Sequence, residues 1–168
     1  MSVERFWNLV EAARASVEEP SDGDQVGERA RQLLDELPLE EVAELARAEW
    51  ELRARSYRVD LWGAAYLING GCSDDGFEYF RGWLMSQGRE VFERAVADPD
   101  TLADVPAVQA GQDLESEEMF GVANLVYWEH TGEALPDRAD YPALPEFWDF
   151  DDDDEVRRRF PRLNVIVD

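Results

Sequence analysis

Apolar residues recur at intervals of three and four through the first two-thirds of the chain. The first set comprises Val3, Phe6, Trp7, Val10, Ala13 and Val17. This spacing places side chains along one face of an α-helix, and a chain that repeats it buries those faces by packing helix against helix. No strand–helix alternation and no repeated unit accompanies the pattern. The sequence therefore predicts an all-α fold, a compact bundle of about six or seven helices.

Turn and capping residues divide this pattern into separate helices. Asp22, with Gln25 three residues later, is typical of a capping box and predicts the start of the second helix. Pro38 suits the first turn of a third helix. The segment 57–68 is apolar nearly all round in its second half, which predicts a central helix covered on several sides. Gly70 is expected to end that helix.

The following segments carry similar signals. Asp75, with Glu78 three residues later, predicts the capped start of the next helix. Residues 101–114 are expected to form a loop with a short helical turn. Ser116 precedes two acidic residues and predicts the start of another helix, which Gly132 closes.

The character of the chain changes after residue 132. Aromatic residues follow without helical spacing: Tyr141, Phe147, Trp148 and Phe150. We interpret 133–150 as an extended, aromatic-rich arm pinned to the helical body by these rings. The predicted organisation is therefore a helical domain over 1–132 and an acidic C-terminal arm over 133–168, packed on the same domain.

The end of the arm contains two further patterns. The acidic run 151–154 precedes the arginines of 157–159, which is typical of a short helix whose first and last turns complement its dipole. Leu163, Val165 and Val167 then alternate with other residues, which predicts one short strand.

The charge of the chain excludes some partners. The 168 residues carry a net charge of −23, and all 16 cations are arginine. A protein that binds nucleic acid or an anionic membrane surface needs clustered cations, so neither is expected as a partner. The expected partner is a basic protein. The arginines of 53–58 and 157–162 are expected to pair internally. A GC-rich bacterial genome and adaptation to salt both explain the absence of lysine.

The predicted location is the cytoplasm. No stretch reaches the roughly 18 apolar residues of a membrane span. The first residues include Glu4, Arg5 and Glu11, where a signal peptide needs uninterrupted apolar residues. A single cysteine permits no internal disulfide.

Neither a metal nor a cofactor is predicted. A zinc site needs several Cys or His ligands, and the chain has only Cys72 and His130. The run 149–153 resembles the opening of a calcium loop, but Asp154 stands where the turn needs glycine and Phe160 where a glutamate belongs. The glycine-rich loop before residue 76 lacks the lysine of a phosphate-binding loop. Cys72 is expected to be a small buried residue at a helix junction.

The run from Asp60 to Glu90 reads DLWGAAYLINGGCSDDGFEYFRGWLMSQGRE. It resembles the bacterial family known as domain of unknown function 4240, and the resemblance extends over roughly residues 3 to 132. It implies the fold of that family and supplies no catalytic residues.

The same run concentrates polar and aromatic side chains around one helix–turn–helix corner. The candidate pocket or interface residues are Trp62, Asn69, Cys72, Asp74, Asp75, Tyr79, Arg81 and Trp83. Tyrosine, tryptophan and arginine are the residue types that dominate binding interfaces. The structural alternative is that Asn69 and Ser73 satisfy backbone ends, Asp75 caps a helix and Arg81 pairs with an upstream carboxylate.

Two functions are consistent with these features. The first is a non-catalytic binding module with a strongly acidic surface, similar in kind to an inhibitor or immunity protein. The second is a small-molecule enzyme or ligand-binding protein that uses carboxylate, arginine and tyrosine groups of the 69–83 corner. The sequence identifies no catalytic residue and no oligomeric state.

Overall fold

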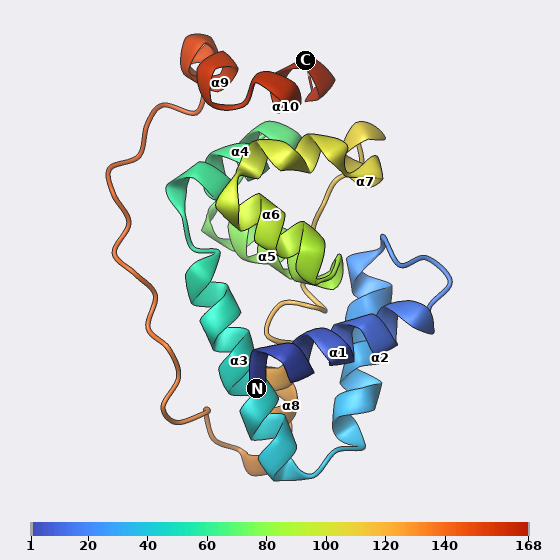
Figure 1. Cartoon of the computed structure of the whole chain (residues 1–168). Coiled ribbons are helices and arrows are strands. Elements are labelled where there is room, and N and C mark those ends of the chain that lie inside the picture. Colours follow the sequence, from blue (N-terminus) through green and yellow to red (C-terminus); the bar gives the residue numbers. More distant parts are fainter. Residues whose placement is uncertain (1, 168) are drawn as a thin grey trace.

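The protein consists of helices joined mostly by short turns, with one long extended segment (Figure 1). The computed structural model describes residues 2–167, and no strand occurs among them. The helices are α1 (Ser2–Ala15), α2 (Gly23–Asp35), α3 (Leu39–Arg55), α4 (Val59–Asn69), α5 (Asp74–Ser86), α6 (Arg89–Ala97), the 3-10 helix η1 (Pro99–Asp104), α7 (Pro106–Gln109), α8 (Val122–Thr131), α9 (Asp153–Arg159) and α10 (Pro161–Val167). The predicted all-α class and extended arm are confirmed.

The helices form two groups that α5 joins (Figure 1). In the first group, α3 packs against α1 and α8, and α2 packs against α1 and α8. In the second, η1 packs against α4, α6, α7 and α10. Helix α5 contacts α1 and α2 on one side and α4 and α6 on the other. The apolar stripes found in the sequence therefore meet in one continuous core.

Helix α4 is the covered central helix that its composition predicts. Leu61, Ala64 and Ala65 are fully buried. At Gly63, a Cβ atom would lie 2.7 Å from the ring of Trp148 in the arm. The absence of a Cβ atom at Gly63 therefore allows the arm to pack directly on α4.

The predicted helix start at Ser116 is wrong, because α8 begins only at Val122. The backbone of 116–120 passes between two glycines on neighbouring helices. A Cβ on Gly27 would lie 2.6 Å from the Met119 nitrogen, and one on Gly82 would lie 2.3 Å from the Ser116 carbonyl oxygen. The Ser116 N–H also donates to the Tyr79 carbonyl at 2.8 Å. These contacts with α2 and α5 hold the segment in a turn.

Of the two helix caps predicted from the sequence, at α2 and α5, the structure confirms the first and contradicts the second. The Asp22 carboxylate accepts the backbone N–H groups of the first turn of α2, as predicted. At α5 the cap is Ser73, whose hydroxyl accepts the N–H of Gly76 at 3.1 Å, so the prediction for Asp75 is wrong. Asp75 lies in the first helical turn, where its charge still complements the helix dipole.

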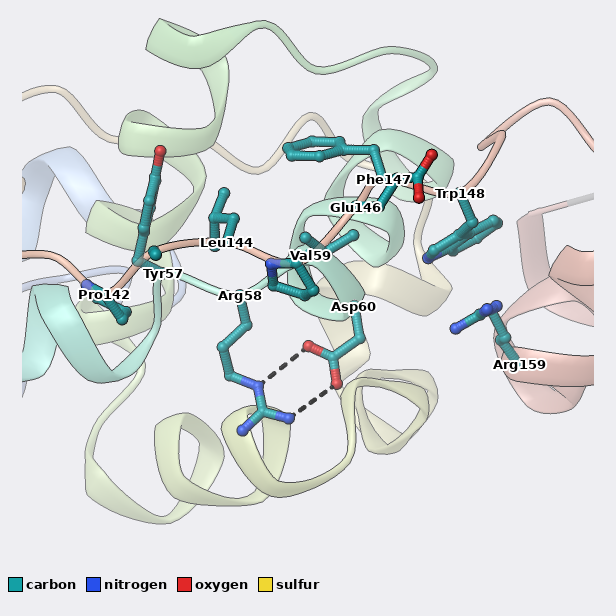
Figure 2. A pocket seen from close by; sticks show the side chains of 12 residues that line it. Tyr57, Arg58, Val59, Asp60, Pro142, Leu144, Glu146, Phe147, Trp148 and Arg159 are labelled. Atoms are coloured by element: carbon teal, nitrogen blue, oxygen red, sulfur yellow. Dashed lines mark hydrogen bonds and ion pairs between the residues drawn. The ribbon is translucent and has the colours of Figure 1, made fainter.

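The segment 133–150 has no regular secondary structure and runs past α3 and α4 (orange in Figure 1). Its aromatic rings attach it to the body. Tyr141 stacks on Tyr57 with ring centroids 4.5 Å apart, and Phe147 meets Trp62 edge-on at 5.1 Å (Phe147 is labelled in Figure 2). The predicted role of these aromatics is confirmed.

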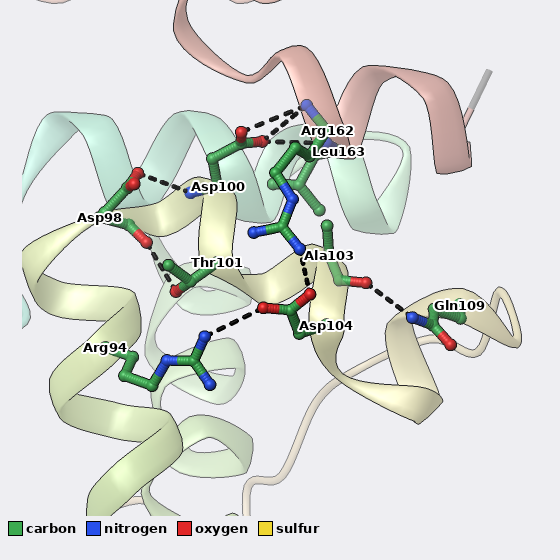
Figure 3. Close-up of polar contacts among 9 residues, drawn as sticks. All are labelled: Arg94, Asp98, Asp100, Thr101, Ala103, Asp104, Gln109, Arg162 and Leu163. Atoms are coloured by element: carbon green, nitrogen blue, oxygen red, sulfur yellow. Dashed lines mark hydrogen bonds and ion pairs between the residues drawn. The ribbon is translucent and has the colours of Figure 1, made fainter.

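The predicted C-terminal strand is wrong, because 161–167 form helix α10. The side chain of Asp100 in η1 caps this helix (Figure 3): its carboxylate accepts the N–H of Leu163 at 2.9 Å and that of Arg162 at 3.2 Å. Pro161 fits the first helical position. Of the alternating apolar residues, Leu163 lies in the core but Val165 is exposed. The alternation therefore does not correspond to a strand with one buried face.

No helix among residues 2–167 has both the length and the apolar character required to cross a bilayer. The division into a helical domain over 1–132 and an arm over 133–168 that belongs to the same domain stays a prediction.

Candidate binding site beneath the C-terminal arm

The structure distributes the residues of the predicted corner between the core and the surface. Arg81 and Trp83 are buried in α5, with 1% and 2% of their surface exposed. Asp74 and Asp75 are exposed in the first turn of the same helix. Tyr79 is partly exposed. The pKa of its phenol is raised, mainly by the negative charge of Glu117.

Three corner residues use their polar atoms to tie the backbone together. The Asn69 amide exchanges two hydrogen bonds with the backbone of Leu114, at 3.1 and 3.2 Å. The Trp62 indole donates to the Cys72 carbonyl at 2.9 Å, and the Trp83 indole donates to the Ser21 carbonyl at 3.2 Å. Asn69 therefore has the backbone role that the structural alternative predicts for it.

Cys72 is partly rather than fully buried, which corrects the expectation of a buried residue, and its surroundings differ from those of His130. Burial, followed by the Glu115 carboxylate, raises the pKa of the Cys72 thiol to about 12. At neutral pH this thiol is protonated, whereas a nucleophile needs the thiolate. His130 Nε2 lies 3.3 Å from Asp35 Oδ1 at the end of α2. The described residues contain no group of three side chains suited to a metal ion.

A groove of about 710 Å³ lies between the start of α4 and the arm (Figure 2). One wall is formed by 57–60 and the other by 142–148, with Arg159 at one end. The arm contributes Leu144, two prolines and two aromatic rings to this wall. Phe147 stays 46% exposed, so an apolar surface remains open to a ligand.

The two arginines of the groove are already engaged by carboxylates. Arg58 donates to both oxygens of Asp60, at 3.1 and 3.2 Å (Figure 2). Arg159 lies 4.6 Å from the ring centre of Trp148 and donates to Glu155 at 2.9 Å. Glu146 is exposed in the lining. The groove therefore presents apolar surface together with the carboxylate of Glu146, which forms no ion pair among residues 2–167.

A second cluster, the arginine cage, lies beside the groove beneath Tyr141 of the arm. It consists of Arg53 and Arg81 with the rings of Trp50, Tyr57, Phe77 and Phe120. The guanidinium carbon of Arg53 is 3.9 Å from the centre of Trp50, and that of Arg81 is 4.7 Å from the centre of Phe77. Tyr57 belongs to both the cage and the groove.

Arg81 does not make the ion pair expected from the sequence. No carboxylate among the described residues lies within 4 Å of its guanidinium. It donates to the Arg53 carbonyl at 2.9 Å and to the Tyr141 hydroxyl at 3.5 Å, and its buried Nε has no partner. Burial lowers the pKa of Arg81. Arg53 likewise makes no internal ion pair within the described chain; it lies on aromatic rings.

Glu49 is a buried acid whose charge interacts with that of Arg53. Glu49 is completely buried and accepts hydrogen bonds from the backbone and side chain of Asn124, at 3.1 and 2.6 Å. Burial raises the pKa of Glu49, against the opposing effects of Asn124 and Arg53. Its carboxyl group therefore favours the neutral form more than an exposed glutamate does.

Neither the groove nor the cage could be predicted from the sequence. Both depend on contacts between the arm and helices that lie about 60 to 90 residues earlier, such as Arg53 Nε donating to the Tyr141 hydroxyl at 3.1 Å. The available signal was the set of aromatics without helical spacing after residue 132. It indicated that the arm packs on the body but not where.

The fold and site define an all-α protein whose extended arm forms one wall of an apolar groove and covers an arginine cage. Residues 1–129 match the family described as Protein of unknown function (DUF4240), and the chain belongs to this family. The comparisons with curated proteins and with solved structures gave no match.

Proposed function

We propose that the chain is a non-catalytic binding protein whose groove holds a segment of a basic partner protein that carries both cationic and apolar side chains. The observation that carries this proposal is the groove of about 710 Å³, with its apolar wall and engaged arginines. Concave, mostly apolar sites with a few polar groups are typical of ligand binding.

The charge of the molecule supports a basic partner. The net charge is −23, and the described ion pairs engage only a minority of the 39 acidic side chains. The acidic run 151–154, exposed throughout, follows the groove wall in the chain. A negative surface attracts a positive partner over long distances and increases its rate of association.

The groove itself suits a mixed segment. Phe147 can contact an apolar side chain or the face of a guanidinium, since cations are attracted to aromatic faces. Glu146 offers a carboxylate at the edge. A purely acidic segment would be repelled, and a purely polar one would leave the aromatic surface uncovered.

Titration calorimetry with synthetic peptides tests the proposal. The probe is a short peptide of alternating arginine and leucine, compared with one that has glutamate for arginine and one that has serine for leucine. We expect binding of the first peptide alone, weaker at high salt because screening removes part of the attraction. Absence of binding, or equal binding of the serine peptide, contradicts the proposal.

Two variants locate the binding site. Phe147→Ala is expected to weaken binding of the arginine–leucine peptide about tenfold, the effect of a moderate interface residue. Leu125→Ala is its matched control, because Leu125 is 42% exposed but lies on α8 outside the groove. Glu146→Gln should weaken binding several-fold, and Glu133→Gln, also on the arm, should not. Equal effects of the paired variants would place the peptide elsewhere.

A further inference from the structure

The arginine cage contains a buried cation, Arg81, that forms no ion pair within the described part of the chain. Arg81 is 1% exposed, and no carboxylate of the described chain lies within 4 Å of it. A second guanidinium, that of Arg53, shares the same acceptor oxygen. Buried charges are ordinarily paired, because removing an ion from water without a counter-charge is costly. Two cations around one neutral oxygen are therefore an unusual arrangement in a core.

The group that fills the cage is the phenol of Tyr141. Its ring stacks on Tyr57 at 4.5 Å, and its hydroxyl oxygen accepts from Arg53 Nε at 3.1 Å and from Arg81 Nη2 at 3.5 Å. One neutral oxygen serves two charged donors, and the Nε of Arg81 still has no partner. The phenol therefore fits the cage in shape but brings no negative charge to the two arginines.

The cage and the residue that fills it come from different parts of the chain. The two arginines and the four rings of the cage all lie within residues 1–129, the part that matches the family. Tyr141 lies beyond it, on an arm without regular secondary structure from 133 to 150. The phenol is only partly buried, so its ring lies at the mouth of the cage. Movement of this arm segment would open the cage without unfolding a helix.

We infer that the arginine cage is a binding site for a small aromatic carboxylate, and that Tyr141 occupies this site within the same chain until such a ligand displaces it. A planar ring takes the place of the phenol against Tyr57. A carboxylate has two oxygens and gives one to each guanidinium, which forms charge-assisted hydrogen bonds. The inference goes beyond the proposed function and does not depend on it, since the residues of the cage other than Tyr57 do not line the groove.

Calorimetry on the full chain with benzoate as the probe tests the inference. In Tyr141→Ala the site is vacant, and benzoate is expected to bind at least about tenfold more tightly than to the wild type, where the phenol competes. Benzyl alcohol, which has the ring without the charge, is expected to bind Tyr141→Ala at least about tenfold more weakly than benzoate. The double variant Tyr141→Ala, Arg81→Met should lose this preference.

Two controls keep the outcome decisive. Tyr66→Ala removes a ring that contacts Phe150 and a hydroxyl that donates to Asp151 but leaves the cage and Tyr141 in place, so it should bind benzoate no more tightly than the wild type. If circular dichroism shows that the Arg81→Met variant does not fold, Arg53→Met, at a partly exposed position, replaces it. Equal binding of benzoate and benzyl alcohol, or no binding of benzoate to Tyr141→Ala, would overturn the inference.

Discussion

Gly82 is the position where α5 touches the backbone of the 116–120 turn, and replacing it by alanine should disturb that contact. The added Cβ would lie 2.3 Å from the Ser116 carbonyl oxygen and 2.9 Å from the Phe120 nitrogen. Both are backbone atoms, so a side-chain rotation cannot relieve the clash. Helix α5 and the turn would have to separate, which also displaces the Phe120 ring from the arginine cage.

The expected magnitude follows from two opposing effects. Overpacking of a core costs about 1–3 kcal/mol, and the clash at 2.3 Å is at or above the upper end of this range. Alanine is favoured over glycine within a helix by about 1 kcal/mol. The free energy of unfolding should therefore fall by about 2 kcal/mol, which lowers the Tm of a chain of this size by about 4–8 °C.

Gly76→Ala is the matched control in the same helix. Its added Cβ would meet only side-chain atoms, the nearest being Ser73 Oγ at 3.3 Å, so the helix preference should dominate. We expect unchanged or slightly higher stability, by up to about 1 kcal/mol. Urea unfolding and thermal melts followed by circular dichroism measure both variants. If Gly82→Ala is as stable as Gly76→Ala, the close contact that explains the 116–120 turn is wrong.

Three further predictions concern single side chains. Because burial raises the pKa of Glu49, its stabilising effect is complete below the ordinary value of 4.5 and is lost as pH rises through the folded-state pKa. Urea unfolding across pH should therefore show wild type losing stability relative to Glu49→Gln as pH rises; the opposite trend contradicts this. Since the pKa of Cys72 is about 12, iodoacetamide should alkylate the folded protein far more slowly than the unfolded chain at mildly alkaline pH, and equal rates would refute it. Asp100→Ala removes the cap of α10 and should cost about 1–2 kcal/mol in chemical denaturation, whereas exposed Asp154→Ala should change stability by about 0.5 kcal/mol or less; similar losses would contradict the capping role.

The helices up to α5 could be predicted because their signals are local. Apolar spacing and capping residues such as Asp22 act within a few residues. The turn at 116–120 could not be predicted, since it depends on Gly27 and Gly82, which lie far away in sequence. Helix α10 was missed for the same reason, because its cap comes from Asp100 in η1.

The candidate site, like the fold, could be predicted from the sequence only in part. Sequence motifs directed attention to Arg81, which the structure places in the arginine cage. Its partners could not be predicted, because an upstream carboxylate is the ordinary partner of a buried arginine, and here a backbone carbonyl and a tyrosine of the arm take that place. The groove joins 57–60 to 142–148, and no local pattern connects these segments.

In our proposal, the groove between 57–60 and 142–148 binds a peptide that carries both basic and apolar side chains. The most direct test is a ¹H–¹⁵N correlation NMR titration of the wild-type protein with the arginine–leucine peptide. We predict that the shifted amide signals belong to 57–60 and to the non-proline residues of 142–148, the two walls of the groove. Shifts confined to the exposed start of α5, around Asp74 and Asp75, or no shifts at all, would contradict the claim.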